Sequence, residues 1–303
     1  MVKKYYGALS LFINAVLLVI VLHQARRDSQ VDSRSLTTVN MKSKPVIRTT
    51  KETLYAMYGE GNLTDVDEQL LNYIRSLTSR QGSGGRRLSS KSTRVTYSEY
   101  GGSQFVDELL KRRRNGFFVE CGAFRGEELS DSLFFEKERN WTGILIEAHP
   151  EYHREILTKN RRALVLRACL SSIGRPQLVK FKLAGQGSGV TSLNRNVHLM
   201  KKNLPETDVQ CFSLNSIMAA IGVQHIDFMI LDVEGSELSV LHTIDWTRLS
   251  IDVFSIEYIG VNRTSKLEKI RHFFNATGMY KEVGKLPRHA ADNDGHDVIF
   301  LRV

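Results

Sequence analysis

One segment in the middle of the chain constrains the fold more than any other. An apolar stretch, Phe117–Val119, leads into Glu120 and a turn with two glycines, and a helix is predicted to follow over residues 130–138. A second apolar stretch, Gly143–Ile146, ends in another acid, Glu147. A strand, a glycine turn, a helix and a second strand that ends in an acid form the layout of a βαβ half that binds nucleotides.

Helical and strand patterns then alternate from residue 103 to the end of the chain. The strand over residues 226–233 is a near-continuous apolar run, which is typical of a strand covered on both faces. The alternation predicts a doubly wound α/β domain. Its seven main strands are expected at about 117–122, 142–148, 163–171, 226–233, 252–259, 280–283 and 297–303.

The amino-terminal part is predicted to be a membrane anchor. Between Lys4 and Arg26 lie 21 residues without a charge, and Tyr5–Leu22 is the apolar part. A bilayer core needs about 20 mostly apolar residues. A cleaved signal peptide is the alternative, but His23 and Gln24 suit a cleavage site poorly. The predicted parts are an uncleaved transmembrane anchor at 1–25, a stem with helices and a Ser/Gly/Arg-rich linker at 26–103, and the main domain at 104–303.

Charge does not decide on which side of the membrane the main domain lies. Two basic residues flank the apolar segment at each end, so the excess of positive charge that marks a cytoplasmic side is missing. N-glycosylation sequons would place the domain in a lumen, although sequons also occur by chance. They begin at Asn62, Asn140, Asn262 and Asn275.

Cysteine and charge content restrict the classes of partner. Cys121, Cys169 and Cys211 have no metal-ligand spacing. Buried free thiols are the first expectation, and one disulfide is the alternative if the domain lies in an oxidising compartment. The net charge of +9 is expected to form a solvated basic surface. Nucleic acid is not expected as a partner, because no basic motif is interleaved with aromatic residues.

The glycine turn after the first strand is the first candidate site. It reads ECGAFRG from Glu120 to Gly126, and Phe124 stands where a dinucleotide-binding turn has its second glycine. A pyrophosphate requires a very close backbone approach at that point, whereas S-adenosylmethionine does not. An acid at Glu120 also suits a cationic amino acid or a sulfonium. The alternative is a tight turn that binds nothing. The predicted cofactor-binding residues of the turn are Glu120, Gly122, Ala123 and Gly126.

Acids at three other strand ends complete the candidate site. Glu147 is predicted to bind the two ribose hydroxyls, with capping of the helix at Pro150 as the alternative. Asp232 and Glu234 suit the amino acid part of the donor, a substrate hydroxyl or a metal, and Glu234 also suits a helix cap. Glu257 is a candidate base or a solvated strand end. Asp232 and Glu257 are the candidate catalytic residues, and no metal site is assigned.

Five motifs in this order resemble the FkbM-type methyltransferase domain. They are ECGAFRGE, LIEAHP, LRACLS, ILDVEGSELSVL and the terminal HDVIFLRV. The stretch at 103–157 is most similar to the Star-like animal branch of that family. Over about residues 95–303, the resemblance implies a Rossmann-like seven-stranded methyltransferase sheet with S-adenosyl-L-methionine as the donor. The donor-binding positions that it implies are Glu120, Gly122, Gly126, Glu147 and Asp232.

The resemblance implies two alternative functions. Family members are similar to O-methyltransferases that act on hydroxyls, which implies a membrane-anchored enzyme with a small-molecule or glycan hydroxyl as its substrate. Star-like members are single-span proteins associated with trafficking of membrane cargo, which implies a non-catalytic protein on the same scaffold with a membrane protein as its partner. In both cases the expected location is that of a type II single-pass protein in endoplasmic reticulum, Golgi or endosomal membranes, anchored by residues 5–22.

Overall fold

The computed structural model describes residues 66–80, 85–88, 98, 101–190, 203–259, 262–287 and 295–303. The chain divides into two units, and all described residues belong to the second, Thr49–Val303. The predicted anchor and most of the predicted stem lie outside the described residues. Among the described residues, no helix has the length and apolar character needed to span a bilayer.

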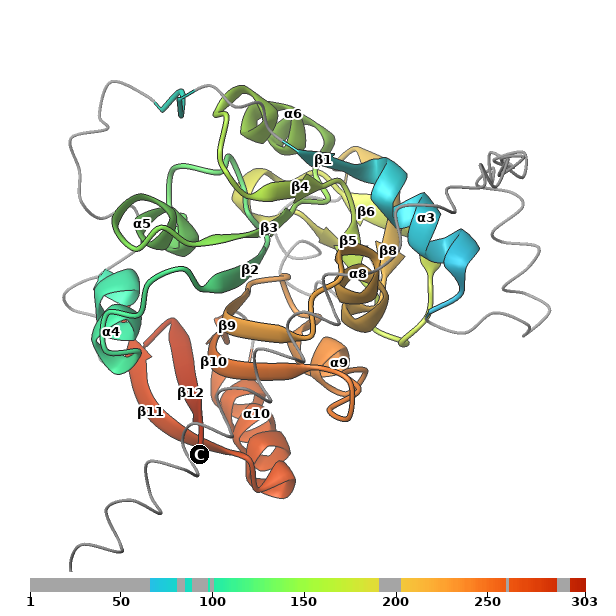
Figure 1. Cartoon of the computed structure of the whole chain (residues 1–303). Helices are drawn as coiled ribbons and strands as arrows, with labels where there is room; N and C mark the ends of the chain where they lie inside the picture. Colours follow the sequence, from blue (N-terminus) through green and yellow to red (C-terminus); the bar gives the residue numbers. More distant parts are fainter. Residues whose placement is uncertain are drawn as a thin grey trace, which may run out of the picture. The chain divides into compact units, whose positions relative to one another are not determined.

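An eight-stranded mixed sheet forms the centre of this unit (Figure 1). Its strand order is β1-β4-β3-β2-β9-β10-β12-β11. The five strands from β4 to β10 run parallel, while β1, β12 and β11 are antiparallel to their neighbours. The direction in which the chain adds strands reverses between β2 and β9, and such a point is where open α/β sheets bind ligands. The bounds are β1 Thr78–Arg80, β2 Phe117–Cys121, β3 Thr142–Ile146, β4 Leu164–Leu166, β9 His225–Leu231, β10 Ser250–Glu257, β11 Tyr280–Leu286 and β12 Asp297–Arg302.

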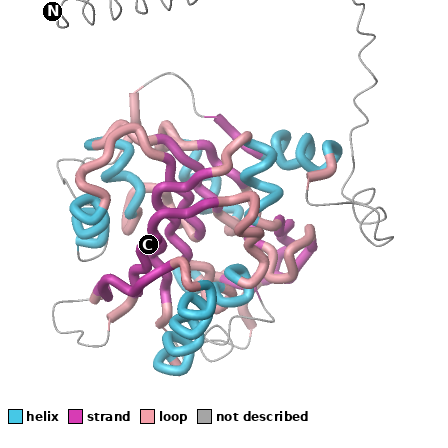
Figure 2. The backbone as a smooth tube through the Cα atoms, turned by 60° about the horizontal axis from the view of Figure 1, so that its bottom comes forward, coloured by secondary structure: helices cyan, strands magenta, loops and turns pink. Residues whose placement is uncertain are grey.

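Helices cover both faces of the sheet (Figure 2). Helices α3, α8, α9 and α10 contribute to one apolar core, in which Ile74, Ile217 and Phe274 are fully buried. Helices α4, α5 and α6 contribute to the core on the opposite face, with Phe135 and Ile156. The predicted doubly wound α/β domain is confirmed. The bounds are α3 Glu68–Leu77, α4 Gly102–Leu109, α5 Asp131–Glu138, α6 Pro150–Thr158, α8 Leu214–Ile221, α9 Glu237–Leu241 and α10 Arg263–Thr277.

Several helix ends follow signals that are visible in the sequence. The hydroxyl of Ser213 accepts the N–H of Ser216 at 3.0 Å and so begins α8. Helix α10 ends at Gly278, whose φ of 64° lies in the left-handed region that glycine adopts readily.

The segment Glu68–Arg80 packs on the main domain, although the predicted boundary at residue 104 places it in the stem. Leu70 and Ile74 are fully buried in the same core as α8, and Arg75 donates to the carbonyl of Ala220 at 2.7 Å. Strand β1 extends the sheet by pairing with β4. The amphipathic pattern of this helix therefore serves the core of the α/β domain.

A second, four-stranded sheet has the order β5-β8-β6-β7. Cys169 on β5 lies opposite Cys211 on β8, and the two form a disulfide. Cys121 is a buried free cysteine. Of the two expectations for the cysteines, the disulfide therefore holds for one pair. The bounds are β5 Cys169–Leu170, β6 Gln177–Lys182, β7 Gly189–Val190 and β8 Glu206–Phe212.

Three details of the strand prediction are wrong. The large sheet has eight strands instead of the expected seven, because β1 pairs with β4 as an additional strand. The single strand expected at 163–171 is two strands in different sheets, because the chain leaves the large sheet after Leu166 and enters the small one at Cys169. Strand β8 was not predicted. Its first three residues, Glu206–Asp208, are polar and at least partly exposed, so the segment lacks a clear apolar pattern.

Candidate functional site

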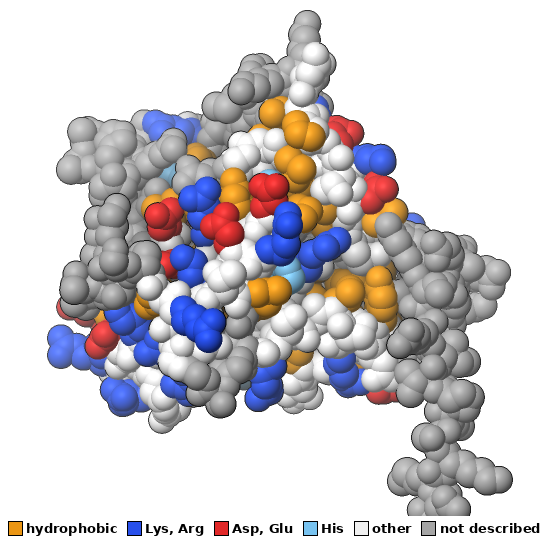
Figure 3. All heavy atoms as spheres, turned by 90° about the horizontal axis from the view of Figure 1, so that it is seen from above, with side chains coloured by type: hydrophobic (Ala, Val, Ile, Leu, Met, Phe, Trp, Pro, Cys, Tyr) orange, Lys and Arg blue, Asp and Glu red, His pale blue; other side chains and the backbone are white. Residues whose placement is uncertain are grey.

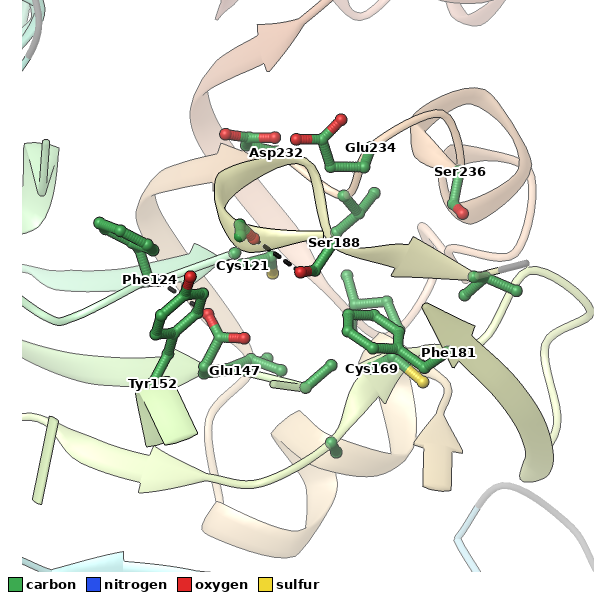
Figure 4. A pocket seen from close by; sticks show the side chains of 18 residues that line it. Cys121, Phe124, Glu147, Tyr152, Cys169, Phe181, Ser188, Asp232, Glu234 and Ser236 are labelled. Carbon is green, nitrogen blue, oxygen red and sulfur yellow. Dashed lines mark hydrogen bonds between the residues drawn. The ribbon is translucent and has the colours of Figure 1, made fainter. Parts of the chain in front are cut away.

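A cavity lies at the carboxyl ends of β2, β3 and β9, next to the point where the strand order reverses. The space between its lining atoms amounts to about 640 Å³ when the solvent at its open mouth is included. Figure 4 shows the carboxylates of Asp232 and Glu234 side by side at one end, and Glu147 beside Tyr152 at the other. The small sheet supplies a further wall through Phe181.

Gly122 brings the turn after β2 against the end of β9. Its φ is 80°, and a Cβ added to it would lie 2.1 Å from the carbonyl oxygen of Asp232. The N–H of Asp232 in turn donates to the carbonyl of Cys121 at 3.3 Å. A glycine is therefore required both by the backbone conformation and by the close approach. Gly122, one of the predicted cofactor-binding residues, lines the cavity.

Glu147 ends β3 and faces the cavity, with an exposed fraction of 6 %. Oε2 accepts the N–H of Phe124 at 2.7 Å, and Oε1 accepts the N–H of His149 at 2.6 Å. The carboxylate thus ties the glycine turn to the entry of α6. Because a carboxylate has about four acceptor sites in all, Glu147 keeps capacity for a hydroxyl in the cavity beside its backbone contacts.

Phe124 replaces the second glycine of a dinucleotide-binding turn in a left-handed conformation, with φ of 48°. Its ring packs edge-on against Tyr152 at 4.5 Å between centroids, and Tyr152 stacks on His149 at 4.0 Å. Arg125 lies over the Phe124 ring at 5.0 Å. Phe124 and Tyr152 of this group line the cavity.

Glu120 is not among the residues that line the cavity. Its side chain lies on the sheet face covered by α5, where its Oε2 accepts the hydroxyl of Ser130 at 2.9 Å and that of Ser132. Burial raises the pKa of Glu120, and Arg161 opposes the rise. Glu120 was predicted to contact the donor, but the structure places its side chain behind the glycine turn and away from the cavity. Ala123 and Gly126 do not line the cavity either.

Arg161 is fully buried and fixes the turn from the same side. Its guanidinium donates to Glu136 at 2.8 Å, to the carbonyl of Gly126 at 2.6 Å and to the hydroxyl of Ser132 at 2.9 Å. Glu120 and Gly126 therefore belong to one buried polar network that holds the turn in shape. A buried network of this kind is stable only when every member has a partner.

Acids gather where β9 and β10 end. Carboxylate oxygens of Asp232, Glu234 and Glu257 all lie within 4.8 Å of one another. Lys266 on α10 forms ion pairs with Glu237 at 2.9 Å and with Glu257 at 3.9 Å. Oδ1 of Asp232 is buried without a hydrogen-bond partner among the described residues. Glu257 is 4 % exposed, so the alternative of a solvated strand end is wrong.

Burial and mutual repulsion raise the pKa values of these acids. Burial, with repulsion from Asp297 and Glu237, raises the pKa of Asp232 to about 7. Burial and repulsion from Asp232 raise the pKa of Glu234 to about 8. Burial likewise raises the pKa of Glu147 to about 8 and that of Glu257 well above its ordinary value. A cation in the cavity would relieve this repulsion and favour the ionised forms.

The capping alternatives are partly correct. Glu237 accepts the N–H groups of Val233 and Gly235 at 3.2 and 3.0 Å, so it fixes the turn before α9. Glu147 accepts the N–H of His149 directly before α6, but it also lines the cavity. Glu234 lines the cavity beside Asp232.

The residues present fit S-adenosyl-L-methionine better than a phosphate-bearing cofactor. Each charged side chain among the described residues that line the cavity is an acid, namely Glu147, Asp232 and Glu234. Such a lining repels phosphate and favours a sulfonium or an ammonium group. Within the part of the chain that the structure describes, Oδ1 of Asp232 also has no hydrogen-bond partner, which a buried oxygen needs.

Several cavity residues could not be found from the sequence. Tyr152 lies in the first turn of α6, and only the nearby Glu147 hints at its role. Phe181, Ser188 and Cys169 reach the cavity from the small sheet and its turn. Their approach depends on long-range pairing between β6 and β8, which no local motif announces.

Residues 120–284 match the model of the Methyltransferase FkbM domain. The sheet with a cavity at its reversal point is an open α/β fold, and the match to the methyltransferase model covers more than half of the chain. The chain belongs to the FkbM methyltransferase domain family. No curated protein matches it.

Solved structures that are similar to the chain include three methyltransferases. The methyltransferase FkbM of Methylobacillus flagellatus is 13 % identical with a TM-score of 0.38, and the match covers 76 % of this chain and 50 % of that one. A precorrin-6y C5,15-methyltransferase of Geobacter metallireducens is 12 % identical with a TM-score of 0.35, covering 74 % and 94 %. SMU.1697c of Streptococcus mutans, solved in complex with SAH, is 8 % identical with a TM-score of 0.36, covering 66 % and 97 %.

Proposed function

We propose that this protein is a membrane-anchored methyltransferase that uses S-adenosyl-L-methionine to methylate a hydroxyl group. The observation that carries the proposal is the acidic lining of the cavity at the reversal point, with Glu147 at one end and Asp232 and Glu234 at the other. The anchor, at residues 5–22, lies outside the described residues, and its apolar sequence supports it.

Each acid has a part in this function. Glu147 accepts the two ribose hydroxyls with the lone pairs that its backbone contacts leave free. Asp232 and Glu234 face the cationic end of the donor and hold it by charge. The donor, when bound, supplies a methyl group on a positive sulfur.

The acceptor hydroxyl must lose its proton as it attacks the methyl group. We assign that proton to Asp232, because its carboxylate lines the cavity. Glu257 does not line the cavity, so we assign it no direct contact with the acceptor. Most of the acceleration would come from alignment of the hydroxyl with the methyl group.

Calorimetric titration of the purified full-length chain with S-adenosyl-L-methionine tests the proposal. We expect saturable heat, and a loss of affinity of at least ~10-fold in Glu147→Ala, since a hydrogen bond to a charged group contributes about 1.5–3 kcal/mol. Glu151→Ala, an exposed acid on the adjoining helix, is the matched control. Absence of heat from folded protein would rule out the enzyme.

A non-catalytic, Star-like role in trafficking of membrane cargo is the second candidate. The observation that favours it is that the carboxylates of Glu120 and Glu147 both accept hydrogen bonds from within the protein. Under this alternative, a membrane protein should co-purify with the chain and should do so equally with Glu147→Ala. Loss of the cargo in that variant would instead link cargo binding to the donor site.

The face shown in Figure 3 is not uniformly basic. On the face shown in Figure 3, basic and acidic side chains lie among one another. The net charge of +9 is therefore accompanied by opposite charges on that face.

A further inference from the structure

Two of the glycosylation sequons lie at the ends of α10, and both asparagines are exposed. Asn262 is the N-cap residue of the helix, in a left-handed conformation, and its side chain makes no capping hydrogen bond. Asn275 lies in the last turn of the same helix. The third residues of these sequons, Thr264 and Thr277, are exposed and partly exposed. A glycan on either asparagine would extend into solvent without displacing a core residue.

The third described sequon differs from these two. The Nδ2 atom of Asn140 donates to Asn115, and its Oδ1 accepts from Arg162. The next residue, Trp141, is fully buried and packs against Phe135. The amide of Asn140 is thus engaged on both sides, and the following side chain is fixed in the core.

The disulfide between Cys169 and Cys211 is a second and independent observation. It joins β5 to β8 in the small sheet and borders the cavity. Disulfides persist in the secretory pathway and outside the cell, whereas the cytosol keeps thiols reduced. The compartment that permits this disulfide is also the one in which sequons are used.

We infer that Asn262 and Asn275 carry N-linked glycans and that the α/β domain lies in an oxidising lumen. In the modification, the amide nitrogen of each asparagine attacks the anomeric carbon of an oligosaccharide carried on a lipid diphosphate. The new C–N bond replaces the C–O bond to the diphosphate, the nitrogen loses one proton, and the lipid diphosphate leaves. With the proposed anchor at residues 5–22, the amino terminus is then cytosolic, which is the type II orientation that charge does not decide.

Expression of the full-length chain in cultured animal cells, followed by peptide-N-glycosidase, tests this inference. We expect a gain in electrophoretic mobility after digestion, and Asn262→Gln and Asn275→Gln should each remove one step of it. Thr264→Ala should act as Asn262→Gln does, whereas Thr264→Ser should keep the step, because serine preserves the sequon. Asn72→Gln is the control, since Asn72 is exposed but belongs to no sequon.

Alkylation of the denatured chain tests the redox part of the inference. We expect one cysteine to react before reduction and three after it. Unchanged mobility of folded protein after digestion would overturn the glycans, and reaction of all three cysteines before reduction would overturn the oxidising compartment. Neither readout depends on donor binding, so failure of the proposed enzyme would leave this inference standing.

Discussion

Gly122 and Asp232 meet without room for a side chain, since a Cβ on Gly122 would lie 2.1 Å from the carbonyl oxygen of Asp232. This contact joins the turn after β2 to the end of β9 across the reversal point of the sheet. The shape of the cavity therefore depends on a position where only hydrogen fits.

Gly122→Ala is expected to destabilise the domain by roughly 2–4 kcal/mol, because it adds a steric clash to an unfavourable backbone conformation. Gly222→Ala is the matched control. Gly222 has a similar φ of 74°, but a Cβ there would meet nothing within 4 Å. The control should cost about 1 kcal/mol. Equal losses in denaturant unfolding would show that the contact with Asp232 does not matter.

Arg161→Ala is expected to cost roughly 3–5 kcal/mol of folding free energy, because Glu136 would lose its buried partner and Glu120 a nearby positive charge. Arg162→Ala, at the exposed neighbouring position, should cost less than about 1 kcal/mol. Chemical denaturation of both variants measures the difference. A small loss in Arg161→Ala would mean that the glycine turn keeps its shape without the network.

Donor affinity is expected to rise with pH between about 6 and 9. The pKa values of Asp232 and Glu147 are raised to about 7 and about 8, so both are largely protonated at the lower limit and ionised at the upper one. A cationic donor favours the ionised forms, and its binding should release protons near neutrality. Titration in buffers with different ionisation enthalpies measures this release. An affinity that falls with pH would contradict the charge-based fit.

Glu234→Gln is expected to stabilise the ligand-free domain at alkaline pH. Folding raises the pKa of Glu234 to about 8, whereas the unfolded chain has the ordinary value. The stability that the protonated side chain contributes is therefore fully present below that ordinary value. It is lost as the pH rises through about 8. The amide cannot ionise, so the advantage of the variant should grow from pH 5 to pH 8 and reach roughly 3–4 kcal/mol, at about 1.4 kcal/mol per pKa unit. Thermal unfolding across pH checks this, with the exposed Glu151→Gln as the control.

Removal of the disulfide by Cys169→Ser with Cys211→Ser is expected to lower stability by about 3–4 kcal/mol, since the crosslink closes a loop with a sequence separation of 42. The proximity of Cys169 to the cavity also predicts weaker donor binding. Reduction of the native chain should lower its stability by the same amount, which unfolding with and without reductant measures. A variant as stable as the native chain would show that pairing of β5 with β8 suffices.

The parts of the fold that local patterns encode were predictable. Apolar strands that end in Glu147 and Asp232 mark the carboxyl edge of the sheet, and Gly122 marks the turn that approaches it. The orientation of Glu120 was not predictable, because successive side chains of a strand point to opposite faces. The motif does not tell which face holds the cavity, and the structure places Cys121 rather than Glu120 in its lining.

The second wall of the cavity was not predictable for a different reason. It comes from a sheet in which Cys169 pairs with Cys211, far along the chain, and from β8, whose polar first half lacks a strand signal. The packing of Glu68–Arg80 on the main domain was also not predictable, because the pattern of an amphipathic helix does not show which surface the helix covers.

The pairing of β1 with β4 has a practical consequence for any shortened version of the protein. Strand β1 covers the outer backbone of Leu164–Leu166, and α3 fills the adjoining apolar surface with Leu70 and Ile74. A fragment that starts at residue 104 would leave an unpaired, apolar sheet edge, which is a template for aggregation. Soluble expression therefore requires a chain that keeps the residues from Glu68 onward.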